Sequence, residues 1–521
     1  MGKKVKEKKD GFLKISLFDP GMTTLHKAGL AGLWMTLEAI ENDTNFKIRV
    51  GRFGSWKRDE TSVSLSWNDE EAFFKELFDV SFGMSQEGFF SFPALGNPDQ
   101  HPQHAVVLQE AVLGTVLQHG RTRKADKSND PRGNLTIAID DISTMLRYHK
   151  IFSYAHRKPD DFQPGAMNRL VGWLYPGGGS RHMGLGKNTD LDNPPGLALA
   201  LRYLIVGAIY FEIHRRGGGV RPRYAMVIPE IDNLRIYAGA RRVFLEHGVQ
   251  RLTAAGTAEA GLRVLAELNA RHLVEDLAVS GCRVFSFGTV PWSSQQKTRV
   301  EIFEVRVERR HDLRPFQVAR QVFEVKLIRP EKGDPFWDVP QAPELIARNV
   351  VEGRPWWQGF ADFIADKDVR EHIFNYEKGG LAKMIQGKDV FPESSERVFI
   401  EACHEAWRRR MGQLGERAGK EGISFHDLVS REFERLRVGF SRSKNAATIR
   451  AAVTDFWARS GGSLASLQGG WREVLALFDE QNWQKARDLA LLALASYKPA
   501  NREEERVLLG TGREKEGGEN G

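Results

Sequence analysis

Phe18–Trp34 reads FDPGMTTLHKAGLAGLW, and the chain is organised around this stretch. Alternating apolar residues between Phe12 and Phe18 predict a strand immediately before it. The Asp-Pro-Gly sequence then favours a turn, after which Thr23 or Thr24 can cap a helix that reaches about Ile40. Because this helix is apolar on nearly every side, we expect it to be buried.

Two polar residues, His26 and Lys27, interrupt the apolar surface near the start of this helix. An anion there would be favoured by the free N–H groups of the helix and by both side chains. The pattern therefore predicts either a phosphate site or a polar patch that only faces solvent. Small residues at positions 28, 29, 31 and 32 would let other backbone approach the helix closely.

Length and composition indicate a globular chain of two or three domains. Of its 521 residues, 41% are hydrophobic and 27% are charged, and the net charge of +7 favours a polyanionic partner. Cys282 and Cys403 lie far apart and form no CxxC pair, which argues against a disulfide scaffold and a zinc finger. A reducing, cytoplasmic setting fits best, and the charged first ten residues do not read as a secretory signal.

The predicted fold class is α+β: a mixed α/β N-terminal region with β-hairpins, over residues 11–333, followed by a C-terminal helical bundle. Leu197–Ile213, the most apolar segment, contains Arg202 and is too short for a comfortable membrane span, so we expect a buried helix there. The expected strands are a hairpin of Phe46–Phe53 with Ser62–Trp67, then Leu135–Ile139, Arg223–Pro229, Cys282–Thr289, Arg299–Val307 and Val318–Ile328.

Strand signals are absent from about Asp334, and linker helices with a helical bundle are expected over residues 334–500. The last helical stretch, Trp471–Tyr497, has a potential break near Asn482. Residues 1–10 form a lysine-rich tail and residues 501–521 a charged, glycine-rich tail, and both are expected to be disordered.

Two long cationic loops interrupt the α/β region, at Arg121–Gly133 and Gly177–Lys187. Long loops inside a compact domain are usually functional or disordered. We expect one loop to read base edges or the minor groove, and the remaining cations to contact phosphate. The candidate residues are Arg121, Arg123, Lys124, Lys127, Asn129, Arg132, Arg181, His182 and Lys187.

The bundle contains two further groups of cations. Arg408 opens a run of three arginines at the end of one helix, where cations suit the dipole. Arg442 and Lys444 precede the start of another helix, where an anion would be favoured. A nucleic-acid contact and a solvated turn are both consistent with this pattern.

Catalytic motifs are incomplete. Gly184–Thr189 resembles a phosphate-binding loop, but Arg181 stands where the Walker pattern needs glycine. Asp312, Glu324 and Lys326 resemble part of a metal-dependent nuclease core, although a solvated strand face would show the same alternation. The 14 histidines lack ligand spacing, so we expect no catalytic residues, no metal and no cofactor.

Phe18–Met22 (FDPGM) and Leu25–Gly32 (LHKAGLAG) resemble the N-terminal signature of large subunits of type I CRISPR-associated Cascade complexes, in their Myxan-type branch (subtype I-A/I-B-like). The stretch Ser441–Gly461 is similar to the helical region of the same subunits. The resemblance implies a non-enzymatic subunit that recognises the motif flanking the target (PAM), starts unwinding and stabilises the R-loop. The alternatives are a restriction-like metal-dependent nuclease and a general single-stranded nucleic-acid-binding protein.

The implied partners are the guide RNA (crRNA), the target double-stranded DNA and its displaced strand, and the Cascade backbone and small subunits. A helicase-nuclease or a transposition module would act downstream, and no membrane is implied. In relatives the small subunit can arise by internal initiation within the large-subunit gene. Met384 is the favoured start here, because a start at Met411 would discard the helix expected at Ser395–Arg410.

Overall fold

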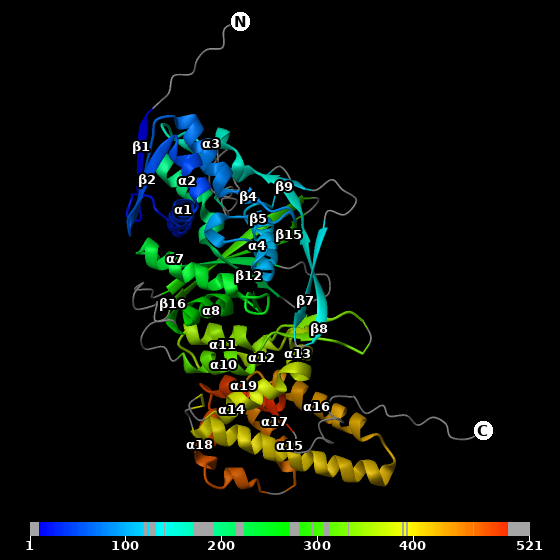
Figure 1. The fold of residues 1–521 in the computed structure, drawn as a ribbon. Coiled ribbons are helices and arrows are strands. Elements are labelled where there is room, and N and C mark those ends of the chain that lie inside the picture. Colours follow the sequence, from blue (N-terminus) through cyan, green and yellow to red (C-terminus); the bar gives the residue numbers. More distant parts are fainter. Residues whose placement is uncertain are drawn as a thin grey trace, which may run out of the picture. The chain divides into compact units, whose positions relative to one another are not determined.

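The computed structural model describes residues 10–118, 122–125, 132–139, 141–170, 174–175, 191–214, 223–270, 281–292, 295–306, 313–331, 333–387, 390–391, 394–461 and 463–498. The chain divides into two compact units. The first comprises Met1–Arg215, Gly219–Glu308 and Val325–Val339, and the second comprises Arg216–Gly218, Arg309–Glu324 and Pro340–Gly521. The first is mixed α/β and the described part of the second is helical (Figure 1), so the predicted fold class is confirmed.

Helix α1 (Thr24–Asn42) is the buried helix predicted from the opening stretch. It packs against α5 (Pro195–Arg202), α6 (Leu204–Gly207) and α7 (Leu234–Val243). Glycine is required at these crossings: a Cβ at Gly29 would lie 1.9 Å from the Ala200 carbonyl oxygen, and one at Gly32 would lie 2.3 Å from that of Tyr203. The small residues thus allow the close backbone approach that the sequence indicated.

The strand before α1 and two strands after it form a three-stranded sheet of order β1-β3-β2. Its strands are β1 (Gly11–Ser16), β2 (Gly54–Arg58) and β3 (Ser62–Trp67), and all pair antiparallel. The prediction of a strand at Phe46–Phe53 is wrong, because α2 (Thr44–Gly51) occupies most of it. The Asp43 side chain accepts a hydrogen bond from the Phe46 N–H at 3.0 Å, and this cap starts a helix where alternation alone suggested a strand.

The larger sheet has five strands in the order β14-β12-β13-β15-β16. Helix α8 (Thr257–Ala270) packs on β13, β15 and β16, whereas α4 (Pro102–Gly114) packs on β12 and β13. The single helix predicted over Leu197–Ile213 is wrong: α5 and α6 are short, and isoleucines and aromatic residues then form a strand. The strands are β12 (Ile209–Ile213), β13 (Arg223–Pro229), β14 (Thr253–Ala254), β15 (Gly281–Trp292) and β16 (Gln295–Arg306).

Smaller elements complete the first unit. The hairpin of β7 (Arg132–Ile139) and β8 (Ile142–His149) packs Leu135, Leu146 and Tyr148 in one hydrophobic cluster with Phe89. The others are α3 (Glu70–Ser81), β4 (Gly83–Met84), β5 (Phe90–Ser91), β6 (Arg123–Ala125), β9 (Ile151–Tyr154), β10 (Asn168–Leu170), β11 (Leu191–Asn193), β17 (Lys326–Ile328) and β18 (Phe336–Asp338). Strand β18 corrects the expectation that strands end by Asp334.

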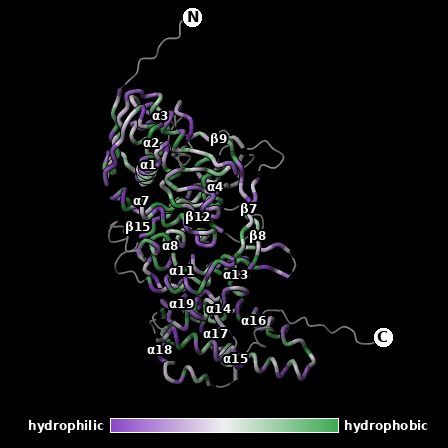
Figure 2. The backbone as a smooth tube through the Cα atoms, in the orientation of Figure 1, coloured by the Kyte–Doolittle hydropathy of each residue, from purple (hydrophilic) through white to green (hydrophobic). Residues whose placement is uncertain are grey.

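The second unit is built around α19 (Trp483–Ser496), which is buried on all sides from Asp488 onward and packs against α12, α14, α15, α16 and α17. Along α15, hydrophilic and hydrophobic residues alternate, as expected of a helix with one packed face (Figure 2). The helices are α10 (Arg314–Val322), α11 (Ala342–Val351), α12 (Phe360–Phe363), α13 (Lys367–His372), a π-helix (Ile373–Glu377), α14 (Lys378–Gln386), α15 (Ser394–Glu421), α16 (Phe425–Ser441), α17 (Ala446–Arg459) and α18 (Trp471–Leu475).

Two expectations for this part of the chain have clear outcomes. The strand predicted at Val318–Ile328 is wrong over most of its length, because α10 starts with Pro315 in its first turn and continues to Val322. The break predicted near Asn482 is confirmed, since Asn482 is the N-cap of α19. None of the helices in the described ranges is both long and apolar enough to cross a membrane.

Candidate nucleic-acid interface

His26, a predicted contact, caps α1 from inside the protein. Its side chain is 3% exposed, and its Nδ1 accepts a hydrogen bond from the Thr23 N–H at 3.2 Å. Its Nε2 lies 2.9 Å from the side-chain amide nitrogen of Asn193. Burial lowers the pKa of His26 to about 4, so the ring is neutral near pH 7. Direct contact of His26 with nucleic acid stays a prediction, and it would require these bonds to break.

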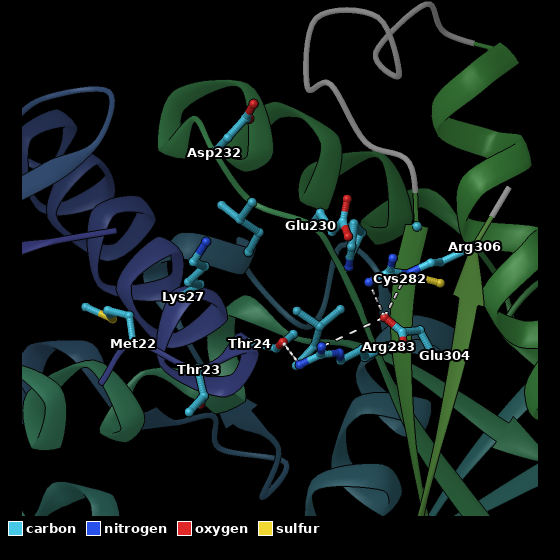
Figure 3. A pocket seen from close by; sticks show the side chains of 14 residues that line it. Met22, Thr23, Thr24, Lys27, Glu230, Asp232, Cys282, Arg283, Glu304 and Arg306 are labelled. Atoms are coloured by element: carbon cyan, nitrogen blue, oxygen red, sulfur yellow. Dashed lines mark hydrogen bonds and ion pairs between the residues drawn. The ribbon is translucent and has the colours of Figure 1, made fainter. Parts of the chain in front are cut away.

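Lys27 lies on the rim of a pocket of about 410 Å³, where the start of α1 faces β13, β15 and β16 (Figure 3). Arg283 donates from Nη1 to the Thr24 hydroxyl at 3.0 Å, and Arg306 pairs with Glu304 at 2.9 Å. The pocket is therefore lined by charges of both signs. Its carboxylates are those of Glu230, Asp232 and Glu304, and its cations are those of Lys27, Arg283 and Arg306. Lys27 makes no ion pair with any described residue.

The β7–β8 hairpin presents a polar face that includes the predicted contact Arg132. Antiparallel pairing sets Arg132 opposite His149 and Asn134 opposite Arg147, so these side chains share one face. All four are exposed, whereas the opposite face contributes Tyr148 to the hydrophobic cluster. Arg147 makes no ion pair within the part of the chain that the structure describes. Arg147 was not singled out from the sequence, although the alternation through residues 142–149 places it on the exposed face.

The two cationic loops are described only in part. Arg123 is half-buried in β6; burial lowers the pKa of its guanidinium, while Glu110 acts in the opposite sense. The backbone of Lys124 is described but its side chain is not. The remaining candidates lie outside the described residues: Arg121, Lys127, Asn129, Arg181, His182 and Lys187.

The bundle cations separate into paired and unpaired groups. Arg409 pairs with Glu405 and Arg410 with Glu432, whereas the adjacent Arg408 is exposed. Exposed cations without an ion pair to a described residue include Arg408, Arg431, Arg442, Lys444 and Arg450.

Arg442 and Lys444 lie beside the start of α17. There the Asn445 side chain accepts from the Thr448 N–H at 2.9 Å, so the helix is already capped. Arg431 and Arg450 were not singled out from the sequence, because isolated cations on exposed helix faces carry no local signal.

Two of the three nuclease-like residues, Glu324 and Lys326, lie among the described residues. Glu324 and Lys326 are both exposed, and Glu324 ends a segment of the second unit whereas Lys326 belongs to the first. Asp312 and the Gly184–Thr189 stretch lie outside the described residues. Within the described ranges, no group of three or more His, Cys, Asp or Glu residues is arranged to hold a metal ion.

Both ends of the chain match known domain families. Residues 14–202 match the DevT N-terminal domain, and residues 388–520 match the DevT C-terminal domain. The CRISPR-associated protein Cas8a1/Csx13 of Myxococcus xanthus (strain DK1622) is 27% identical over 524 residues, which cover 93% of this chain and 88% of that protein. The two domain matches contain the two stretches on which the resemblance was based, and the resemblance is confirmed.

Proposed function

Because the chain resembles large subunits of type I CRISPR-associated complexes over most of its length, we propose that it is the non-catalytic large subunit of an RNA-guided Cascade effector. In this role it binds guide RNA and target DNA in the cytoplasm, recognises the flanking motif, starts unwinding and stabilises the R-loop. Exchange of a DNA duplex for an RNA–DNA duplex is nearly balanced in free energy, so protein contacts to the backbone decide its direction.

The polar face of the β7–β8 hairpin supports a role in reading the flanking motif. A two-stranded ribbon is one of the shapes that the DNA major groove admits. Arg147 and Asn134 are exposed cross-strand neighbours, and arginine and asparagine side chains pair with guanine and adenine edges, respectively. Arg132 on the same face can add a phosphate contact.

The unpaired cations of the bundle support contact with the displaced strand. Arg442, Lys444 and Arg450 follow one another around the start of α17 and are exposed. Phosphate contacts of this kind give affinity without sequence preference, and the affinity falls as salt concentration rises.

The decisive experiment uses the complex assembled with guide RNA and a library of target duplexes with randomised flanking bases. Replacing Asn134 and Arg147 by Ala should relax the flanking preference, with a loss of about 1–3 kcal/mol per base contact. The Lys47→Ala variant is the control, because Lys47 is an exposed cation on α2. An unchanged preference in the double variant would remove the hairpin from this role, while copurified guide RNA would still support the complex.

The nuclease alternative has a separate test. The purified chain is incubated with Mg²⁺ or Mn²⁺ and with single- or double-stranded DNA, which should remain intact. Metal-dependent cleavage that is lost in Glu324→Ala would favour the nuclease instead. Binding to single strands without copurified guide RNA or backbone subunits would favour a general single-strand-binding protein.

A further inference from the structure

Arg241, in the last turn of α7, is a buried cation that no part of the described chain neutralises. Its side chain is 1% exposed, and Nε, Nη1 and Nη2 all lack a hydrogen-bond partner among the described residues. A guanidinium has five N–H donors and stays protonated at any pH that the protein tolerates. The C-terminal dipole of α7 favours its charge but supplies none of the missing acceptors.

The polar groups near Arg241 include a tyrosine hydroxyl and two histidines, none of which carries a negative charge at neutral pH. The Tyr210 hydroxyl on β12 is buried and likewise lacks a partner among the described residues. Buried His104 and His247 lie nearby, and burial together with Arg241 depresses the pKa of His104. The carboxylate of Glu267 lies beside His247, with Oε1 3.8 Å from Nε2.

The start of α4 lies in the same neighbourhood, because His104 is close to Arg241. Its N-cap residue, His101, makes no side-chain cap, and His104 lies in the first turn. The Gln103 side chain accepts from the Val249 N–H at 3.2 Å, which holds this turn against the segment that follows α7. Free N–H groups at a helix start attract negative charge.

We propose that Arg241, Tyr210 and the start of α4 form an internal binding site for a small inorganic anion of chloride size. An uncompensated buried cation is strongly unfavourable, and an anion offsets both the charge and the unpartnered donors of Arg241 and Tyr210. The burial of Arg241 favours a small ion over a nucleic-acid phosphate, whose attached chain would have to enter the core. This site is independent of the proposed function.

The test is thermal unfolding of the full chain at constant ionic strength, with sodium gluconate replaced stepwise by sodium chloride. The Tm should rise saturably by roughly 2–4 °C as chloride fills the site. Arg241→Met should abolish the rise, and Arg241→Lys should weaken it. Arg251→Met, which removes an exposed cation ten positions further along the chain, should retain it.

A chloride response that is identical in Arg241→Met and Arg251→Met would overturn the proposal. If the Met variant does not fold, crystals of the unaltered protein grown in sodium bromide give an independent answer. The expected result is an anomalous peak within hydrogen-bond distance of Arg241. Density for water alone at that position would contradict an anion site.

Discussion

At the scale of single residues, His26 stabilises the start of α1 because burial keeps its imidazole neutral. The folded-state pKa of about 4 lies below the value of 6.5 for an ordinary histidine, so the unfolded chain binds the proton more readily. The stability that depends on His26 is therefore fully present above pH 6.5 and is lost as the pH falls towards 4.

We expect His26→Asn to flatten this decline, because the asparagine side-chain oxygen can accept from the Thr23 N–H in place of Nδ1 and does not titrate. The decline attributable to His26 should be about 3 kcal/mol, measured as the free energy of unfolding in urea between pH 7 and pH 4. His426→Asn, at an exposed position on α16, is the matched control. An equal decline in the His26 variant and the unaltered chain would show that the ring is charged when folded.

Asp488 on α19 is a second residue whose environment decides its chemistry. Its carboxylate accepts from the N–H groups of Gly359 and Ala361, at 2.8 and 2.9 Å, and so ties α19 to α12. Burial raises the pKa of Asp488 to about 6, although the two hydrogen bonds act in the opposite direction. Asp488 therefore loses its proton at a lower pH in the unfolded chain than in the folded chain. The free energy of unfolding falls as the pH rises from about 4 to 6.

Asp488→Ala should destabilise the second unit by about 1–3 kcal/mol for each amide left unpaired. Asp488→Asn should cost less, because the amide oxygen still accepts one bond, and should remove the fall in stability between pH 4 and 6. Both are measured by denaturant unfolding, with exposed Asp479→Ala as control. Equal stability of Asp488→Ala and Asp479→Ala would show that the cap is unimportant.

At the scale of elements, the crossing of α1 with α5 and α6 depends on glycine. A Cβ at Gly32 would lie 2.3 Å from the Tyr203 carbonyl oxygen and 2.8 Å from the Gly207 nitrogen. Both neighbours are backbone atoms and have little freedom to move aside.

Gly32→Ala should therefore destabilise the first unit by at least about 1–3 kcal/mol, the usual range for overpacking, despite the better helix propensity of alanine. Gly51→Ala is the matched control, because a Cβ there meets nothing within 4 Å. The readout is the Tm of the full chain. A Gly32→Ala variant as stable as Gly51→Ala would mean that α1 can shift away from α6.

At the scale of the whole molecule, we propose that the C-terminal helices are also made as a separate product starting at Met384. The DevT C-terminal match begins at residue 388, just after this methionine, whereas Met411 lies within α15. A start at Met384 gives 521 − 384 + 1 = 138 residues and keeps α15 whole. It removes α12 and most of α14, so the face of α19 that contacts them needs another partner.

Expression with a C-terminal tag should show a short second band that Met384→Leu abolishes and Met411→Leu does not. The short product should associate with other subunits, because isolated it exposes apolar surface that costs about 25 cal/mol per Å². Full-length protein should persist in both variants. A single full-length band, or a short band that survives Met384→Leu, would contradict internal initiation at this position.

Local sequence pattern predicted an element correctly where capping, turn and flanking residues favour the same structure as its hydrophobic periodicity. The sequence predicted the buried helix α1, strand β13, the break before α19 and the change from α/β to helical structure. Predictions were wrong where two local signals competed. The cap at Asp43 makes α2 helical although its residues alternate, and Ile209–Ile213 forms a strand although it follows a helical segment.

The fold class and the resemblance to CRISPR-associated large subunits could both be predicted from the amino-acid sequence, because periodicity and motifs are properties of neighbouring residues. Which cations lie together and which are neutralised depends instead on contacts between distant parts of the chain. Arg283 donates a hydrogen bond to Thr24, which lies 259 residues away in the sequence. Arg409 and Arg410 form ion pairs, whereas the adjacent Arg408 is exposed. These outcomes follow from long-range backbone approach, such as that of α1 to α6, which no local pattern encodes.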